Sequence, residues 1–578
     1  MDLYSPLPLT QPSVSKVASK RACSNANKQN IFYKIITNYI KDEKTKFLFV
    51  LFISLILNLF QVNVISFINS KIVDSLEHKN FKNSHKYIYY LIYAIIIYII
   101  LFYVYNYFDS RLLINLKIYI KNQLMKIIFI GNNENLNENN FTIFNTPINR
   151  IAYTTYQIAT NIFSLLIPKL SIIAIIFAYF FYKNAIFGGI FLIGNIFLTW
   201  YIYKSINSLL NTAMISEDIN INNEFTQTEM LNNIEKIISK GQIHEELKIY
   251  HKETKNMVDS YNNYFSTMNN SLFIINLLMN GLVIILIYYL IYQYKNKNIG
   301  IATVITFLTL LLLYRESITN IINFIPLHVD NYIRLETVNK YMNNLSKNYH
   351  KLDEINNYKI HSLNFDNIRL ENVYFKYERS NNYILNNKSI SINLNDKIIG
   401  ITGKSGLGKS SLMKIILKLF PYEGNIFIDN ININELCPNY IRKNIVYVNQ
   451  NSKLFDKKVI DNLLYSCNSE NHDYQKYIDE ITSYPIIKKL FINIDLNKSA
   501  GHGGEKLSGG QRQIINIING LIHESKIIIL DEPTNALDMN LKKEIIKLIK
   551  DFKKYKKCII IISHDKDIFE IFDEKIEL

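Results

Sequence analysis

The chain reads Gly403-Lys404-Ser405-Gly406-Leu407-Gly408-Lys409-Ser410 in the stretch that decides the fold of its C-terminal part. This stretch fits the pattern G-x-x-x-x-G-K-[ST], with a strand-like run before it at Lys397 to Thr402 and an apolar helix after it at Ser411 to Leu419. Glycines let the backbone curl so that its N–H groups point at phosphate oxygens, and the helix N-terminus adds positive potential. Lys409 would reach the β and γ phosphates, and Ser410 would hold Mg²⁺. The pattern predicts a nucleoside triphosphate site rather than an idle surface loop.

A second element of the same site is the stretch Ile527-Ile528-Ile529-Leu530-Asp531-Glu532, which reads as a buried strand ending in two acids. Successive side chains of a strand point to opposite faces, so Asp531 and Glu532 are expected to have different roles. We expect Asp531 to orient Mg²⁺ and Glu532 to act as general base on the attacking water. Two exposed acids at a strand end are the plain alternative, which their position before Pro533 in a chain with a phosphate loop disfavours.

Long uncharged apolar runs fill the first 330 residues. The first, Phe47 to Ser70, has no charged residue, and about 20 helical residues suffice to cross a hydrocarbon core of roughly 30 Å. Buried core helices of a large soluble protein are the alternative, but soluble folds rarely supply so many such runs in succession. We therefore predict six membrane-spanning helices at about 47–70, 87–108, 158–182, 184–203, 270–294 and 298–325.

The connections between these spans alternate in length. They are short after the first, third and fifth spans and long after the second and fourth, which places the long ones on one side of the membrane. The long segments are polar with helical periodicity, as in Arg111 to Ile128 and Glu224 to Tyr250, so we expect the helices to continue beyond the membrane. The C-terminal part follows the sixth span and lies on that same side.

Composition limits the function classes. The chain has 578 residues, 49% of them hydrophobic, and a formal net charge of +15. The apolar runs exclude a wholly soluble enzyme, and the aromatic fraction of 13% excludes intrinsic disorder. The positive charge is dispersed, and membrane proteins carry excess Lys and Arg on cytoplasmic loops, so we expect no nucleic acid partner. The four cysteines are widely spaced and indicate neither a disulfide framework nor a zinc site.

The N-terminal segment, residues 1–30, carries Lys16, Lys20, Arg21 and Lys28 against the single acid Asp2. This composition is compatible with an organelle transit peptide, whereas a disordered tail is the alternative that we favour.

The sequence Leu507-Ser508-Gly509-Gly510-Gln511 resembles the signature of ATP-binding cassette (ABC) proteins. The order of phosphate loop, signature and Asp-Glu strand matches that family over residues 366–578. The resemblance implies an all-α six-helix transmembrane domain at residues 31–345, followed by an α/β ABC ATPase domain with a helical signature subdomain at residues 366–578. This architecture resembles a half-transporter of the exporter type.

The resemblance also implies roles for single residues. Tyr377 is similar to the aromatic residue that stacks on adenine, and Gln450 to the glutamine that touches Mg²⁺ and water. His564 resembles the histidine that contacts the γ-phosphate. The stretch Asn535-Ala536-Leu537-Asp538 resembles the loop that bridges two subunits. The implied catalytic residues are Lys409, Gln450, Glu532 and His564, the metal ligands Ser410, Gln450 and Asp531, and the nucleotide contacts Tyr377, residues 403–411 including Ser411, Ser508, Gly510, Gln511 and Asp538.

In ABC proteins the signature and the phosphate loop lie on opposite faces of a domain. The resemblance therefore implies a dimer with two composite sites, each pairing Lys409 and Glu532 of one chain with Ser508 of another. A homodimer is expected, because the motif residues are intact. Two departures stand out: His502 replaces the acid that exporters usually place before the signature, and only 14 residues follow His564.

Charged residues within the spans are the candidates for substrate contact. Lys169 lies about 13 residues, roughly 20 Å, from the outer end of its span. Arg315 and Glu316 lie on the sixth span. If Lys169 and Arg315 face the cavity, an anionic or amphipathic substrate is expected, because buried charges usually face a cavity or pair with each other. The alternative is that Lys169 snorkels and the other two cap the inner interface.

These observations predict an ATP hydrolase that uses ATP and Mg²⁺ to export a small molecule, peptide or lipid across a bilayer. An ATP-gated channel or a regulatory membrane subunit is the alternative from another functional class. Both ends of the chain are expected on the cytosolic or matrix side of a multi-pass integral membrane protein. The mitochondrial inner membrane is one option that stays open.

Overall fold

The computed structural model of the chain describes residues 31–133, 136, 141–353, 362–377, 380, 382–404, 406–450, 452–467, 474–492, 494–535 and 537–578. It divides into two compact units. The first comprises residues 1–128 and 139–346, and the second comprises residues 129–138 and 347–578.

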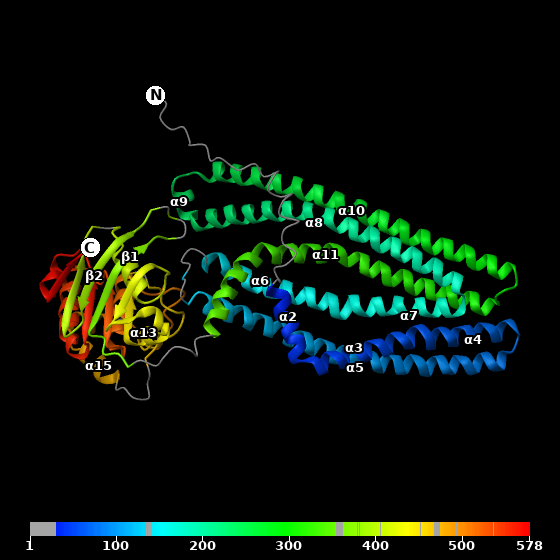
Figure 1. The fold of residues 1–578 in the computed structure, drawn as a ribbon, viewed down its shortest axis with the longest axis horizontal. Coiled ribbons are helices and arrows are strands. Elements are labelled where there is room, and N and C mark those ends of the chain that lie inside the picture. Colours follow the sequence, from blue (N-terminus) through cyan, green and yellow to red (C-terminus); the bar gives the residue numbers. More distant parts are fainter. Residues whose placement is uncertain are drawn as a thin grey trace, which may run out of the picture. The chain divides into compact units, whose positions relative to one another are not determined.

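Within its described residues the first unit consists of helices joined by short turns (Figure 1). Six of its helical segments are long and apolar enough to cross a membrane. They cover Lys44–Glu77, Phe81–Gly131, Arg150–Lys183, Ala185–Asn232, Ile243–Lys295 and Ile301–Glu336. The helices are α2 (Ile31–Asp42), α3 (Lys44–Leu59), α4 (Ser66–Glu77), α5 (Phe81–Gly131), α6 (Phe141–Thr160), α7 (Ile167–Lys183), α8 (Ala185–Asn232), α9 (Ile234–Ser239), α10 (Ile243–Lys295) and α11 (Ile301–Asp353).

Two of the spans contain a π-helical segment. Phe60–Ile65 separates α3 from α4, and Asn161–Leu166 separates α6 from α7. Such wider turns within α-helices are rare and occur frequently at functional sites. They divide the first and third spans at comparable positions along the helices.

Tight turns join the spans at one end of this unit. Asn184 forms the turn between α7 and α8, and its side chain caps α8 by accepting a hydrogen bond from the N–H of Phe187 at 3.0 Å. Gly188 is required just beyond, because a Cβ there would lie 2.7 Å from the Cα of Phe181. Figure 1 shows the turns α4–α5, α7–α8 and α10–α11 toward one end of the helical unit and α9 at the other.

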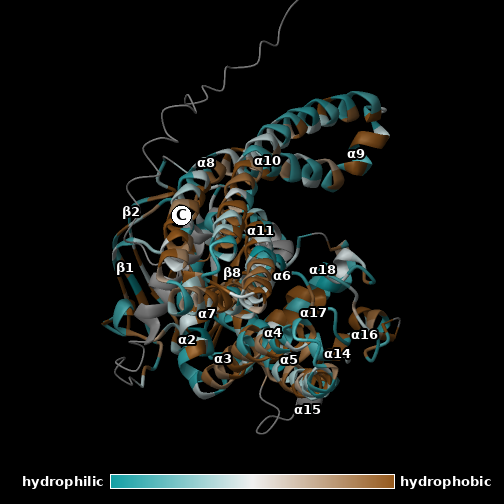
Figure 2. Ribbon diagram, turned by 90° about the vertical axis from the view of Figure 1, so that its right-hand side faces the viewer, coloured by the Kyte–Doolittle hydropathy of each residue, from teal (hydrophilic) through white to brown (hydrophobic). Residues whose placement is uncertain are grey.

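The helices α5, α8, α10 and α11 are each about 50 residues long, as the polar periodicity between the spans predicts. At 1.5 Å per residue they are about 75 Å long, well over twice the roughly 30 Å of a hydrocarbon core. Figure 2 shows that hydrophilic residues dominate the parts of α8 and α10 next to α9. These parts extend beyond the apolar segments.

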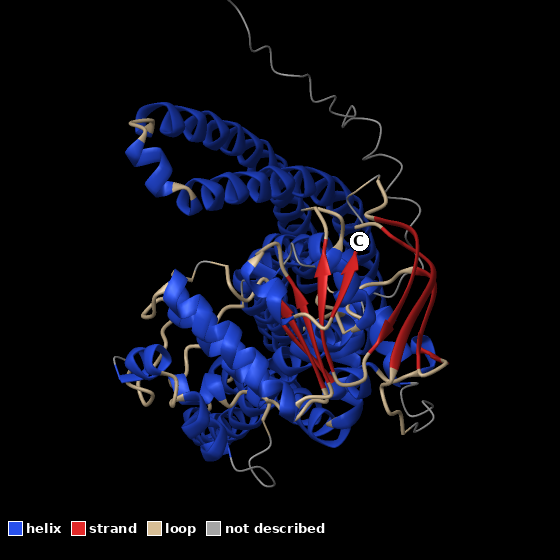
Figure 3. Cartoon of the chain, turned by 90° about the vertical axis from the view of Figure 1, so that its left-hand side faces the viewer, coloured by secondary structure: helices blue, strands red, loops and turns tan. Residues whose placement is uncertain are grey.

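The second unit contains two sheets (Figure 3). One is antiparallel, with strand order β2-β1-β4-β5. The other has the order β6-β7-β8-β3-β9, and its pairs are parallel. The strands are β1 (Asn367–Phe375), β2 (Leu385–Asn393), β3 (Lys397–Thr402), β4 (Glu423–Ile428), β5 (Ile431–Asn432), β6 (Ile445–Val448), β7 (Ile527–Asp531), β8 (Cys558–Ile562) and β9 (Glu574–Glu577).

The parallel sheet forms the core of the second unit. Strands β7 and β8 are buried along their whole length, because both faces of a parallel sheet are covered by helices and its strands read as continuous apolar runs. The helices are α12 (Lys409–Ile416), α13 (Pro438–Asn444), α14 (Val459–Leu463), α15 (Tyr474–Ile481), α16 (Pro485–Ile492), α17 (Gly509–Ile522) and α18 (Met539–Phe552).

Strand register places the site. Ile401 on β3 pairs with Ile562 on β8, and Asp531 on β7 pairs with the same Ile562. The carboxyl ends of these three strands therefore meet at one edge of the sheet. The loops that follow them, which carry Lys409, Glu532 and His564, converge at that edge, where ligands of open parallel sheets bind.

Candidate functional site

The phosphate loop turns sharply into α12. Gly406 and Gly408 have φ values of +86° and +89°, in the region that side chains other than glycine rarely adopt. A Cβ on Gly408 would lie 2.6 Å from a side-chain carbon of Ile384, so that position has room only for glycine. Ser405 lies outside the described residues.

Lys409 is held inside this loop. Its Nζ donates to the carbonyl oxygens of Gly403 and Lys404, both at 3.0 Å, and lies 3.2 Å from Nε2 of His564. Burial lowers the pKa of Lys409, while the nearby carboxylates of Glu532 and Asp531 act in the opposite direction. A cation that is partly desolvated and close to the loop backbone is well placed to contact a phosphate.

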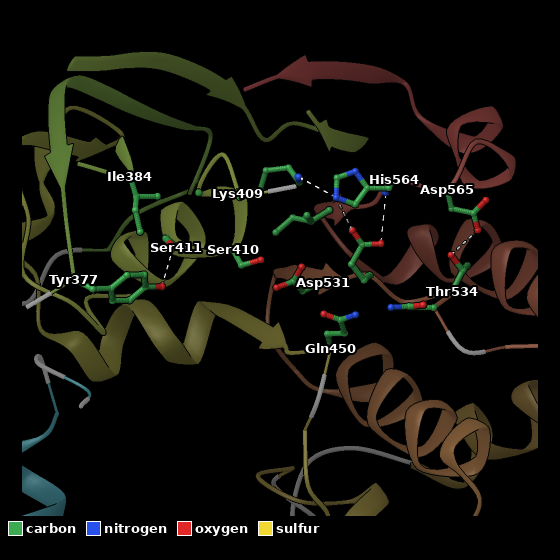
Figure 4. A pocket seen from close by; sticks show the side chains of 15 residues that line it. Tyr377, Ile384, Lys409, Ser410, Ser411, Gln450, Asp531, Thr534, His564 and Asp565 are labelled. Carbon is green, nitrogen blue, oxygen red and sulfur yellow. Dashed lines mark hydrogen bonds and ion pairs between the residues drawn. The ribbon is translucent and has the colours of Figure 1, made fainter. Parts of the chain in front are cut away.

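A cavity of about 740 Å³ opens beside the loop (Figure 4). Its volume is in the range of small-molecule and cofactor sites. Ten residues predicted from the sequence line it: Tyr377, Gly406, Gly408, Lys409, Ser410, Ser411, Gln450, Asp531, Glu532 and His564. Asn535, the first residue of the predicted bridging loop, also lines it, and the sequence did not single out the other four: Ile384, Thr534, Ile562 and Asp565.

Tyr377 stands at one end of the cavity in Figure 4. Its ring lies edge-on to Phe375 and Phe420, with ring centroids 4.9 and 5.5 Å away. Its hydroxyl and that of Ser411 are 2.9 Å apart and form a hydrogen bond. Ser411, predicted as a nucleotide contact, thus anchors Tyr377 to α12. Stacking of Tyr377 on adenine stays a prediction.

The two acids at the end of β7 diverge, as the alternation of a strand predicts. Asp531 is 5% exposed, and its Oδ2 accepts a hydrogen bond from the hydroxyl of Tyr447 on β6 at 2.6 Å. Glu532 turns toward the end of β8, where its Oε1 lies 3.5 Å from Nε2 of His564. The two carboxylates therefore belong to different environments within one cavity.

The backbone at Glu532 is constrained. Its φ is +51°, an unusual value for a residue with a side chain, and its N–H donates to the carbonyl of Ile562 at 2.8 Å. The side-chain amide of Gln513 on α17 donates to the carbonyls of Glu532 and Pro533 at 3.1 and 2.8 Å. Strained backbone of this kind persists where its surroundings hold it, and it clusters at active sites.

A charged network supports the segment after Glu532. Thr534 donates to Asp565 at 2.8 Å, and Lys542 forms ion pairs with Asp565 and Asp567, both at 2.6 Å. Burial alone would raise the pKa of Asp565, but the hydrogen bonds from Lys542 and Thr534 outweigh it and lower that pKa. These contacts join residues from separate loops, and no local sequence pattern indicated them.

The signature residues do not line the cavity. Ser508 and Gln511 form a reciprocal capping box at the start of α17, with hydrogen bonds of 2.8 and 3.2 Å. Asp538 caps α18 by accepting hydrogen bonds from the N–H groups of Asn540 and Leu541. Gly510 is likewise outside the cavity lining, as are Gly403, Lys404 and Leu407 of the phosphate loop.

The oxygen donors in the cavity fit Mg²⁺. The hydroxyl of Ser410, the side-chain amide of Gln450 and the carboxylate of Asp531 all line it. Mg²⁺ prefers hard oxygen ligands and is usually bound through one or two carboxylates together with substrate phosphates. These three side chains would hold the ion, which would neutralise phosphate charge.

In the first unit, Lys169 on α7 pairs with Glu316 on α11, with Nζ and Oε1 3.8 Å apart. Two of the three predicted substrate residues are therefore partners of each other. Arg315 is exposed and lies next to Glu316 on α11.

The segment between α5 and α6 contributes a contact within the second unit. Arg442 on α13 donates to both the side-chain oxygen and the carbonyl of Asn133, and its Nε donates to the carbonyl of Leu417 after α12 at 2.9 Å. The N–H of Leu136 donates to the carbonyl of Leu419 at 2.8 Å. Asn133 and Leu136 thus lie against the C-terminal end of the helix that follows the phosphate loop.

Comparison with known families gives two matches on this chain. Residues 45–318 match the model of the ABC transporter transmembrane region, and residues 385–535 match the ABC transporter model. The second match includes the phosphate loop, the signature and the Asp-Glu strand. The matches follow each other in the order that the fold shows.

Curated relatives share parts of the chain. A protein of Rickettsia typhi described as an export ATP-binding/permease protein is 36% identical over 213 residues, 36% of each chain. The lacticin-481/lactococcin-DR transport/processing ATP-binding protein of Lactococcus lactis is 29% identical over 417 residues, 68% of this chain and 56% of that protein. The ATP-dependent lipid A-core flippase 2 of Colwellia psychrerythraea is 30% identical over 209 residues, covering 36% and 35%. The chain spans about a third of the length of the first curated relatives it matches.

A solved structure, a bacterial Atm1-family ABC exporter with ATP bound, superimposes with a TM-score of 0.75. The match covers 93% of both chains at 15% sequence identity, so it shows the fold alone. With the two family matches, it confirms the predicted fold class of a six-helix membrane region followed by an α/β ATPase domain. The chain therefore belongs to the ABC transporters and is a half-transporter of the exporter type.

Proposed function

We propose that this protein is an ATP-driven exporter that acts as a homodimer. The observation that carries the proposal is the cavity that brings together Lys409, Asp531, Glu532 and His564 at one edge of the parallel sheet. Phosphoryl transfer needs a cation on the phosphates, an acid for the metal and a group that positions the attacking water. All three kinds of group line this cavity.

The residues divide the hydrolytic work. Lys409 and the N–H groups of the loop would bind the phosphates, and Ser410, Gln450 and Asp531 would hold Mg²⁺. Glu532 would accept a proton from the attacking water, because its carboxylate lies beside His564 in the cavity. His564 is within reach of both Glu532 and Lys409 and would contact the γ-phosphate.

A second copy completes each site. Ser508, Gly510 and Gln511 are not part of the cavity of their own chain, which supports their use on the nucleotide of a partner. The connection between α8 and α10 supports the same conclusion. On α9, Ile234 and Ile238 are 52% and 57% exposed at the polar end of that hairpin, and apolar residues exposed there favour a protein partner.

The transported compound is a small amphipathic molecule, a peptide or a lipid. The Lactococcus relative is described as a bacteriocin transport and processing protein and the Colwellia relative as a lipid A-core flippase, so the relatives share export and differ in cargo. ATP binding would close the dimer, and hydrolysis would reset it. Both ends of the chain then lie on the side where ATP is present.

Accumulation of a compound in proteoliposomes tests the proposal. Pools of labelled peptides, lipids and amphipathic compounds would be added with Mg·ATP to vesicles whose ATPase domains face outward. An exporter accumulates one compound above its equilibrium level, and Glu532→Gln abolishes the accumulation. Equilibration without accumulation, obtained equally with a non-hydrolysable ATP analogue, would instead identify an ATP-gated channel and overturn the proposal.

A further inference from the structure

Helix α11 has two unlike faces along its apolar part. Leu310, Tyr314, Ile318 and Ile322 are buried in the core of the helical unit. The exposed side chains on this part of the helix are Leu312 and the polar residues Arg315, Glu316 and Asn323. A charged and polar face on the apolar part of a membrane-spanning helix needs an explanation, since that part would lie in hydrocarbon.

The exposed faces of two other spans are different. On α5, the exposed side chains from Ile88 to Tyr103 are isoleucine, tyrosine and phenylalanine. On α10, the exposed side chains from Phe273 to Ile291 are also uncharged and apolar or aromatic. These faces suit lipid, so the polar face of α11 is a specific feature and not a general property of the helices.

The depth of Arg315 in the membrane indicates which surroundings this polar face needs. Arg315 lies 14 residues after Ile301, where α11 begins, which corresponds to about 21 Å of helix in a hydrocarbon core of roughly 30 Å. A charged side chain exposed to lipid at that depth costs several kcal/mol, and such residues face a water-filled cavity or one another. An aqueous cavity beside this face of α11 would meet that requirement.

The charges on this face do not cancel. Lys169 and Glu316 neutralise each other across 3.8 Å, with side chains 24% and 64% exposed. Among the residues that the structure describes, the guanidinium of Arg315 makes no hydrogen bond or ion pair. The guanidinium of Arg315 is therefore an exposed cation that the Lys169–Glu316 pair does not neutralise.

The pair is held in place from a third helix. The side-chain amide of Asn58 on α3 donates to the carbonyl of Pro168 at 3.0 Å and to Oγ of Ser171 at 2.6 Å, on either side of Lys169. The π-helical segments Phe60–Ile65 and Asn161–Leu166 lie directly beside these contacts along α3 and α7. Polar contacts and unusual helix geometry coincide around Lys169.

We propose that Arg315 binds the acidic group of an amphipathic organic anion, and that the Lys169–Glu316 pair sets the charge of the site. This inference rests on the proposed export function and names its substrate class. The planar guanidinium offers paired donors to a carboxylate, sulfonate or phosphate. Leu312, three residues before Arg315 on the same helix, is exposed and would contact the apolar part of the compound.

The test uses three dansyl compounds that share an apolar ring system and differ in charge. Dansyl-glycine is an anion, dansyl-glycinamide is neutral and dansyl-cadaverine is a cation. Their binding to the full-length protein in phosphatidylcholine nanodiscs is measured by dansyl fluorescence, and stimulation of ATP hydrolysis is normalised to the basal rate of each variant. We expect dansyl-glycine to bind about tenfold more tightly than the other two, as for a hydrogen bond to a charged group.

Four variants separate the roles of the charges. Arg315→Gln weakens dansyl-glycine binding about tenfold, and Arg315→Lys restores part of it. Glu316→Gln strengthens binding, because Lys169 loses its partner and becomes a second free cation, whereas Lys169→Gln weakens it by leaving Glu316 unopposed. Lys204→Gln is the matched control, because Lys204 is an exposed cation of α8, just after the predicted fourth span, and lies over Trp200. It leaves binding unchanged.

The outcomes distinguish a failure of the anion site from a failure of the export function. Equal binding of the three compounds, or no change in Arg315→Gln, overturns the anion site while export stands. Absence of ATP hydrolysis under every condition overturns the export function itself. A further arm with phosphatidylglycerol in the nanodiscs identifies the source of the anion: competition with dansyl-glycine assigns the site to a lipid headgroup, and its absence assigns it to a soluble compound.

Discussion

The side-chain amide of Gln513 donates a hydrogen bond to the main-chain carbonyl of Pro533 at 2.8 Å. Gln513 lies on α17, directly after the signature, and Pro533 follows the expected general base Glu532. The same amide also donates to the carbonyl of Glu532 at 3.1 Å. The helix that begins with the signature is therefore tied to the backbone that positions the catalytic carboxylate.

Gln513→Ala should lower kcat for ATP hydrolysis about tenfold with little change in KM for ATP, because two hydrogen bonds of roughly 0.5–1.5 kcal/mol each are lost from the backbone at Glu532. Steady-state kinetics in nanodiscs measure both constants. Asn516→Ala is the matched control: its amide donates to the carbonyl of Ser452, at 2.9 Å, and not to the Glu532 segment. A parallel loss in both variants would assign the effect to general destabilisation of α17.

Tyr447→Phe should raise the Mg²⁺ concentration needed for half-maximal hydrolysis about ten- to a hundredfold, since a hydrogen bond to a charged group contributes roughly 1.5–3 kcal/mol. The lost hydroxyl donates to Asp531 at 2.6 Å and orients that carboxylate. Titration of Mg²⁺ at saturating ATP measures the change. Tyr422→Phe removes a hydroxyl that bonds Asn434 and should behave as wild type. An unchanged Mg²⁺ requirement in Tyr447→Phe would argue against Asp531 as a metal ligand.

Mixing two inactive chains tests the composite site. Lys409→Ala removes the phosphate contact, and Ser508→Asp keeps the cap of α17, because Asp is as good an N-cap as Ser, but places a carboxylate against the partner's phosphate. Each variant alone should be inactive. A purified heterodimer has one intact site out of two related by symmetry, so roughly half of the wild-type activity should return. No activity in the heterodimer would contradict sites shared between chains.

The buried Lys556 makes the stability of the ATPase domain depend on pH. Its Nζ donates to the carbonyls of His523 and Ser525, and burial lowers its pKa to about 8 from 10.5. Between these values the unfolded chain binds more protons than the folded chain, so the free energy of unfolding attributable to this group rises from pH 8 toward pH 10.5.

Thermal unfolding at pH 8 and pH 10 measures this effect. The midpoint of the wild type relative to that of Lys556→Met should increase at the higher pH. The exposed Lys543 provides the control, and Lys543→Met should show the same pH dependence as the wild type. A constant difference between the wild type and Lys556→Met would show that Lys556 keeps its proton in the folded state.

The phosphate loop and the Asp-Glu strand were predictable because their chemistry is local. The phosphate-binding residues and the two acids each lie within a few consecutive residues. The strand or helix beside each motif is indicated by its run of apolar residues. The long helices α8 and α10 were predictable for a similar reason, since their periodicity continues past the uncharged segments. Gly408 was predictable for the same reason, because the backbone conformation there needs glycine and this requirement is met by a single residue of the sequence.

Contacts between distant segments were not predictable from one sequence. Tyr447 reaches Asp531 because β6 and β7 pair with Tyr447 opposite Ile529, a register that no local pattern specifies. Gln513 reaches Pro533 through the packing of α17. Lys169 and Glu316 were recognised as separate charges, and their pairing depends on the approach of α7 to α11.

ATP hydrolysis by the full-length protein in nanodiscs tests the export function most directly, with wild type compared against Glu532→Gln. Both forms should bind ATP, because the substitution keeps the size of the side chain and leaves Lys409 in place. We expect the wild type to hydrolyse ATP and to be stimulated by one class of amphipathic compound, and the variant to lose hydrolysis by more than 100-fold, as expected when a general base is removed. ATP binding without hydrolysis in both forms would contradict an ATP-driven exporter.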